Sequence, residues 1–100
     1  MAGHCYVAAE ALYYLLGGRR SGYTVMRIRR KFMGGDTHWF LLAPGAREWT
    51  KKWIVDPTWD QFGPKGPPYH LAEFSFFVTN RRNAGPSNRA MELMRRIKYR

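Results

Sequence analysis

An apolar helix is the clearest element of this chain, and it spans most of HCYVAAEALYYLLGG, residues 4–18. Between positions 5 and 16 the apolar side chains recur at helical spacing: Val7, Ala8, Ala11, Leu12, Leu15 and Leu16. Gly17 and Gly18 follow, and glycine readily adopts the left-handed backbone that ends helices. The pattern therefore predicts an apolar helix over 5–16, with Cys5 in its first turn.

Four segments after this helix are rich in β-branched and aromatic residues, which is typical of strands. They span residues 23–30, 38–43, 53–56 and 73–79. A glycine-rich turn signal at 34–36 and a polar connection at 44–48 separate the first three, while the segment 63–68 is expected to be a loop because it contains three prolines. We expect these strands to form an antiparallel sheet.

The C-terminal segment predicts a second helix, with Ser87 as its N-cap. Its expected buried stripe consists of Ala90, Leu93, Met94 and Ile97, and its arginines Arg89, Arg95, Arg96 and Arg100 are expected to face water. The sequence therefore predicts one α+β domain over residues 1–100: an N-terminal helix packed on an antiparallel sheet, followed by a C-terminal helix.

Cysteine usage and hydropathy indicate the class of environment. The chain has one cysteine among its 100 residues, so an intramolecular disulfide is impossible and the thiol is left for chemistry. No apolar run is as long as a membrane span. We expect a soluble protein in a reducing compartment, the cytoplasm.

Positive charge is the second strong feature of the sequence. Seventeen Lys and Arg residues against seven Asp and Glu residues give a formal charge of +10. Such an excess favours anionic partners: an acidic protein, a nucleotide or a nucleic acid. The expected anion-binding residues are Arg27 and Arg29, which share one strand face, and Arg95 and Arg96 on the last helix. The alternative is a solvated coat that keeps the protein soluble.

Cys5, His38 and Asp56 follow one another in the order of a nucleophile, a base and an orienting acceptor. A helix N-terminus favours a thiolate, because its N–H groups lack intrahelical partners. If Ile54 pairs with Phe40 across the predicted hairpin, Asp56 lies opposite His38, with Cβ atoms about 5 Å apart. The three residues therefore predict a cysteine-dependent acyl-transfer site.

Each member of this set also has a structural interpretation. A cysteine near a helix start is often a small buried hydrophobe. A histidine before a tryptophan often serves only as a hydrogen-bonding residue, and aspartate before proline commonly ends a strand. The catalytic hypothesis depends on the three occurring together, in this order and on these elements.

Several segments resemble the core of the transglutaminase-like superfamily, a branch of the papain-like cysteine enzymes. They are the Gly3-His4-Cys5 helix, the strand Gly22-Tyr23-Thr24-Val25-Met26, the pair His38-Trp39, and Trp53-Ile54-Val55-Asp56-Pro57-Thr58. The chain also resembles small bacteriophage proteins that have a His-Cys-Tyr-Val opening and an Asp-Pro-Thr-x-x-Gln-Phe block.

The resemblance implies a minimal papain-like core in which Cys5 is the nucleophile, His38 the general base and Asp56 the orienting carboxylate. It also makes His4 and Gln61 candidates for completing an oxyanion hole, with Trp39 a candidate substrate contact. A chain of this length implies a substrate cleft that is either minimal or completed by a partner subunit in a homo-oligomer. A bacteriophage source implies action on a host factor in the bacterial cytoplasm.

We expect no metal and no cofactor. The residues of metal-binding type include His4 and His70, but neither Cys-x-x-Cys nor His-x-x-x-His spacing occurs. His70 follows a proline-rich segment and is expected to be a loop residue. Two function classes remain: a hydrolase, protease, deamidase or transglutaminase-type enzyme that uses the Cys-His-Asp triad, and a non-catalytic basic module. The module would bind nucleic acid or an anionic nucleotide signal, as in phage counter-defence.

Overall fold

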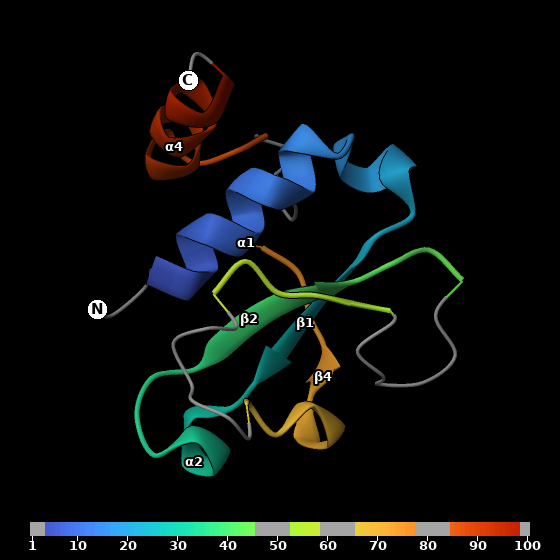
Figure 1. Ribbon diagram of the computed structural model, residues 1–100, viewed down its shortest axis with the longest axis vertical. Helices are drawn as coiled ribbons and strands as arrows, with labels where there is room; N and C mark the ends of the chain where they lie inside the picture. The colour runs from blue at the N-terminus through green and yellow to red at the C-terminus, as the bar shows by residue number, and fades with distance from the viewer. Residues whose placement is uncertain (1–3, 46–52, 59–65, 78–84, 99–100) are drawn as a thin grey trace.

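The computed structural model describes residues 4–45, 53–58, 66–77 and 85–98. The described elements confirm the predicted α+β class, with an N-terminal helix, a four-stranded antiparallel sheet and a C-terminal helix (Figure 1). Helix α1 spans His4–Leu15 and lies between the sheet and helix α4, which spans Asn88–Lys98. The first helix therefore has a covered face on either side.

The sheet has the strand order β3-β2-β1-β4. Its strands are β1 (Thr24–Ile28), β2 (His38–Leu42), β3 (Ile54–Val55) and β4 (Glu73–Phe74), and every neighbouring pair is antiparallel. All four are shorter than the sequence predicted. The strand expected over 23–30 ends at Ile28, because the next residue caps the short helix α2, Arg30–Met33. The alternating pattern gave no indication of this helical turn.

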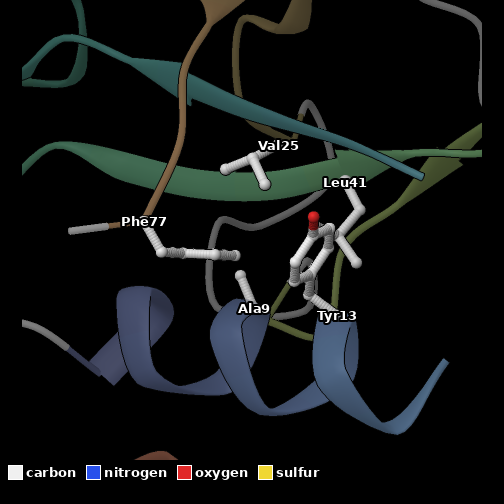
Figure 2. Close-up of a cluster of buried hydrophobic side chains, with 5 residues drawn as sticks. All are labelled: Ala9, Tyr13, Val25, Leu41 and Phe77. Carbon is white, nitrogen blue, oxygen red and sulfur yellow. The ribbon is translucent and has the colours of Figure 1, made fainter. Parts of the chain in front are cut away.

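Helix α1 covers one face of the sheet through a cluster of buried side chains. Ala9 and Tyr13 of the helix meet Val25 of β1 and Leu41 of β2, and Phe77 joins them from the segment after β4 (Figure 2). The helix ends at Leu15, one residue before the predicted end, and Gly17 follows with φ +116°. Only glycine adopts such a backbone without strain, so the diglycine signal marks the helix end correctly.

The opposite face of the sheet has a second core. Met26 and Ile28 of β1 pack there with Phe40 and Leu42 of β2. A short 3-10 helix, η3 (Tyr69–Leu71), contributes Tyr69 to this side. Odd-numbered residues of β1 and β2 therefore face α1, and even-numbered residues face this second core.

Ser87 links α4 to α1 through hydrogen bonds. Its Oγ accepts a hydrogen bond from Ala90 N at 3.2 Å, as expected of an N-cap, and the same hydroxyl donates to Glu10 of α1 at 2.6 Å. The predicted buried stripe of α4 is wrong at its last member. Ala90 is buried, but Ile97 is 51% exposed. Since α4 packs mainly along one neighbouring helix, only part of its apolar stripe is covered.

Candidate active site

Three elements bring the predicted nucleophile, base and carboxylate together. Cys5 lies in the first turn of α1, His38 is the first residue of β2, and Asp56 directly follows β3. The side chains of His38 and Asp56 are buried, with only 1% and 2% of their surfaces exposed. Cys5 is half-buried, so a small molecule can reach its sulfur more easily than it can reach the other two groups.

The contact between His38 and Asp56 is short and direct. Nε2 of His38 lies 2.6 Å from Oδ2 of Asp56. The predicted hairpin register was wrong by two residues, because Ile54 pairs with Leu42 rather than with Phe40. A slip of two residues keeps every side chain on its original face. Asp56 therefore still reaches the side of the sheet on which His38 lies.

Asp56 receives hydrogen bonds on both of its oxygens. Tyr69 donates its hydroxyl to Oδ2 at 2.7 Å, while the backbone N–H and the hydroxyl of Thr58 donate to Oδ1 at 3.0 and 3.2 Å. Burial raises the pKa of Asp56, but the hydrogen bond and charge of His38, with the donors on Tyr69 and Thr58, outweigh it and lower the pKa below its ordinary value. The carboxylate is therefore held in its charged form.

Cys5 lies against the edge of β2 that faces β3. Ala43 N donates to Trp53 O at 2.8 Å, so odd-numbered residues of β2 direct their backbone groups toward β3. Within the described residues, β3 pairs only with positions 41 and 42. At the start of β2 the cysteine occupies this edge instead. Its thiol donates to Thr37 O at 3.3 Å, and the backbone of Trp39, on the same edge, lowers the pKa of the thiol.

The pKa values of Cys5 and His38 shift toward an ion pair. Burial raises the pKa of the Cys5 thiol, but His38 and the backbone N–H groups of Trp39 and Tyr6 outweigh burial and lower the pKa below its ordinary value. Burial lowers the pKa of His38, but its hydrogen bonds and charge interactions with Asp56 and Cys5 raise the pKa to about 9. At neutral pH both shifts favour a thiolate beside an imidazolium.

Trp39 contributes to the site mainly by packing. Its ring meets Tyr6 edge-on at 4.8 Å and lies nearly parallel to Phe77 at 5.8 Å between centroids. These contacts hold the N-terminal turn of α1 against β2, and thereby hold Cys5 near His38. The indole of Trp39 is half-buried, so part of it is accessible, and its role as a substrate contact stays a prediction.

The side chains of both predicted oxyanion residues lie outside the described part of the structure. His4 begins α1, but its side chain lies outside the described part of the structure. Gln61 lies wholly outside the described residues. Both assignments stay predictions. His70 is exposed on η3, one residue from Tyr69.

The four arginines predicted to bind anions form two separate pairs, one at the end of β1 and one on α4, and each pair shares one glutamate. Arg27 and Arg29 both contact Glu73. On α4, Arg95 and Arg96 both contact Glu92, at 3.6 and 3.4 Å. Each group of three therefore keeps a net positive charge.

Two residues of the site were missed by sequence reasoning. Thr58 had a local signal, because an aspartate two residues before a threonine often accepts hydrogen bonds from its backbone N–H and hydroxyl. Tyr69 had none. It approaches Asp56 only through the packing of η3 on the second core, where its ring contacts Phe40 edge-on at 4.9 Å.

No family model, curated protein or solved structure matches this chain. A function for this chain is therefore inferred from the geometry of the site and from the motifs around Cys5, His38 and Asp56. Among the described residues, no three His, Cys, Asp or Glu side chains are grouped so as to hold a metal ion. No helix in those same segments is long and apolar enough to cross a membrane.

Proposed function

We propose that this protein is a cysteine-dependent acyl-transfer enzyme in which Cys5 is the nucleophile, His38 the acid and base, and Asp56 the group that orients His38. The observation that carries the proposal is the buried His38–Asp56 contact of 2.6 Å, on a histidine whose pKa both Asp56 and Cys5 raise. A buried pair of this kind holds one imidazole tautomer and stabilises the imidazolium.

The ring nitrogens of His38 have separate tasks. Because Nε2 bonds Asp56, Nδ1 is the nitrogen that exchanges a proton with Cys5. The thiolate attacks an acyl carbon and forms a sulfur–carbon bond, and the carbonyl oxygen becomes an oxyanion. Backbone N–H groups in the first turn of α1, which have no carbonyl partner within the helix, are suited to bind that oxyanion.

Collapse of this intermediate completes the first half of the reaction. The bond from carbon to the leaving nitrogen or sulfur breaks, and the leaving group takes the proton from Nδ1 of His38. The thioester on Cys5 is then attacked by water or by an amine, whose proton returns to Nδ1. Attack by water gives hydrolysis, as in a protease or a deamidase, and attack by an amine gives a transglutaminase-type product.

The motif resemblance supports a narrower version of this proposal. The Cys5 helix, the His38-Trp39 pair and the Asp56-Pro57-Thr58 block are similar to the transglutaminase-like superfamily and to small bacteriophage proteins. The narrower proposal is a phage-encoded enzyme that acts on a host factor in the bacterial cytoplasm.

The test is the pH dependence of Cys5 alkylation by iodoacetamide. In the native protein the rate should follow a pKa well below the value of about 8.5 for a free cysteine. His38→Ala removes the imidazolium, so its profile should move upward toward that value. Thr24→Ser, a conservative change on β1, serves as the matched control and should leave the profile in place. Identical native and His38→Ala profiles near the free-thiol value would contradict the proposal and favour the binding module.

A further inference from the structure

The sheet surface beside Cys5 carries a group of three charged side chains that the reaction does not use. Arg27 belongs to β1, and its cross-strand partners are Trp39 on β2 and Glu73 on β4. Arg29 follows on the same side of the chain and also contacts Glu73. We call Arg27, Arg29 and Glu73 the arginine subsite.

The two arginines do not contact the glutamate in the same way. Arg29 engages both carboxylate oxygens, through Nε to Oε1 and through a terminal nitrogen to Oε2 at 3.3 Å. Such a two-pronged contact directs and neutralises a carboxylate. Arg27 approaches Oε1 only with Nε, at 3.2 Å. Among the described contacts, neither terminal nitrogen of Arg27 donates to Glu73. The side chain of Arg27 is 37% exposed.

The charge of the arginine subsite is therefore unequally distributed. Arg29 and Glu73 form a neutral pair, while Arg27 remains as a positive group with donors for an external acceptor. A guanidinium presents these donors in a planar fork that matches a carboxylate.

The arginine subsite lies on the strand next to the one that Cys5 contacts. The Cys5 thiol donates to the carbonyl of Thr37, two residues before Trp39 of β2, and Arg27 of β1 is the cross-strand partner of Trp39. Neighbouring strands are about 4.8 Å apart, and an extended peptide advances about 3.3 Å per residue. An acidic side chain about two residues from the reacting carbonyl would therefore reach Arg27.

We propose that Arg27 recognises a carboxylate on a peptide substrate, about two residues from the acyl group that Cys5 attacks. This proposal rests on the proposed function, because it names the substrate class of the same site. Peptides fit both parts of the site: they carry the acyl groups that a cysteine nucleophile attacks, and an acidic residue supplies the charge that complements Arg27.

Two matched alkylating probes test the proposal. One is iodoacetyl-glycyl-glutamate amide, and the other is its glutamine counterpart, which has the same length and lacks the charge. With either probe the Cys5 sulfur displaces iodide and forms a sulfur–carbon bond. The native protein should react about threefold faster with the glutamate probe, as expected of one partly exposed charge pair. The ratio of the two rates should fall as salt is added.

Three variants show which residue is responsible. Arg27→Gln should bring the ratio of the two rates close to one. Glu73→Gln should raise the ratio above the native value, because it releases Arg29 as a second cation. Arg20→Gln is the control: Arg20 is exposed on the 3-10 helix Gly18–Ser21, beyond the other end of α1, so the change removes the same unit of charge there and should keep the native ratio.

The outcomes separate this proposal from the proposed function. A native ratio of one, or an unchanged ratio in Arg27→Gln, overturns the carboxylate subsite even when iodoacetamide shows an activated thiol. Loss of activation toward iodoacetamide itself contradicts the proposed function instead. Protection of Cys5 by a short oligonucleotide but not by an acidic peptide would overturn the proposal in favour of a nucleic acid partner.

Discussion

The hydroxyl of Tyr69 donates a hydrogen bond to Oδ2 of Asp56 at 2.7 Å, and the same oxygen lies 2.6 Å from Nε2 of His38. One carboxylate oxygen therefore holds a phenol and an imidazole. Thr58 holds the other oxygen, so the carboxylate cannot turn without losing several hydrogen bonds. Tyr69 therefore acts on Cys5 only indirectly: it fixes Asp56, and Asp56 positions His38.

Replacing Tyr69 with phenylalanine should destabilise the protein near neutral pH. The change leaves the ring packing on Phe40 in place and removes one donor from a buried carboxylate, which costs about 2 kcal/mol. Because the pKa of Asp56 is lowered in the folded state, the stabilisation is present above pH 3.8 and is lost as pH falls through the folded value. Urea unfolding at a series of pH values measures it. A difference between the two proteins that persists unchanged in acid would show that Asp56 is not involved.

Local patterns predict part of the site, and tertiary packing decides the rest. The apolar period before Gly17 places Cys5 in the first turn of a helix, and the strand pattern places His38 at the start of β2. The hairpin register depends on the length and shape of a long connection, which no local pattern specifies. Tyr69 meets Asp56 because η3 covers the second core, and that contact depends on how the whole sheet is covered.

The same division holds for the fold. The class and the order of the elements follow from alternation, helical spacing and glycine signals, and these were confirmed. The predicted strand lengths were too long, because a strand ends where it no longer has a neighbouring strand to pair with. The helical turn after Ile28 shows this, since no strand in the described segments pairs with the residues beyond Ile28. The predicted burial of Ile97 was wrong for a similar reason. Helical spacing identifies the apolar stripe of a helix, but it does not show how much of that stripe a neighbouring element covers.

Replacing Asp56 with asparagine should raise the pKa at which Cys5 becomes reactive. An amide has nearly the shape of the carboxylate but no charge, so the imidazolium of His38 loses its strongest support and the thiolate loses its counter-ion. The iodoacetamide profile should shift upward, by an amount smaller than in His38→Ala, because a neutral imidazole remains beside the sulfur. Asp36→Asn, in the exposed turn before β2, is the matched control and should leave the profile unchanged. If the iodoacetamide profile of Asp56→Asn matched that of the native protein, Asp56 would have no part in activating Cys5.

Replacing Cys5 with alanine should make the stability of the protein fall with rising pH. In this variant His38 keeps its proton in the folded state through Asp56, while the unfolded chain loses that proton above pH 6.5. The unfolded state then binds fewer protons, and stability falls by up to about 1.4 kcal/mol per pH unit until the folded histidine also titrates.

The native protein should respond differently over the same range. Its folded state holds one proton on the thiolate–imidazolium pair, and its unfolded state holds one proton on the free thiol. The proton counts are equal, so stability should change little between pH 6.5 and the onset of thiol ionisation in the unfolded chain. Urea unfolding of both proteins between pH 6 and pH 9 makes the comparison. Parallel curves would mean that Cys5 and His38 form no ion pair in the folded protein.

Replacing Ser87 with alanine should weaken the docking of α4 without changing the chemistry of Cys5. Ser87 donates to the fully buried carboxylate of Glu10 through both its backbone N–H, at 3.0 Å, and its hydroxyl, at 2.6 Å, while the hydroxyl also caps α4. Losing the cap and one donor to a buried acid should lower the free energy of unfolding by about 2 kcal/mol. The N-terminal turn of α1 is held by Tyr6 and Trp39 on the sheet side, so the iodoacetamide profile should keep its native midpoint. A shifted midpoint would mean that α4 helps to position the thiol, and Ser87→Thr, which restores both the cap and the donor, should then return the midpoint to its native value.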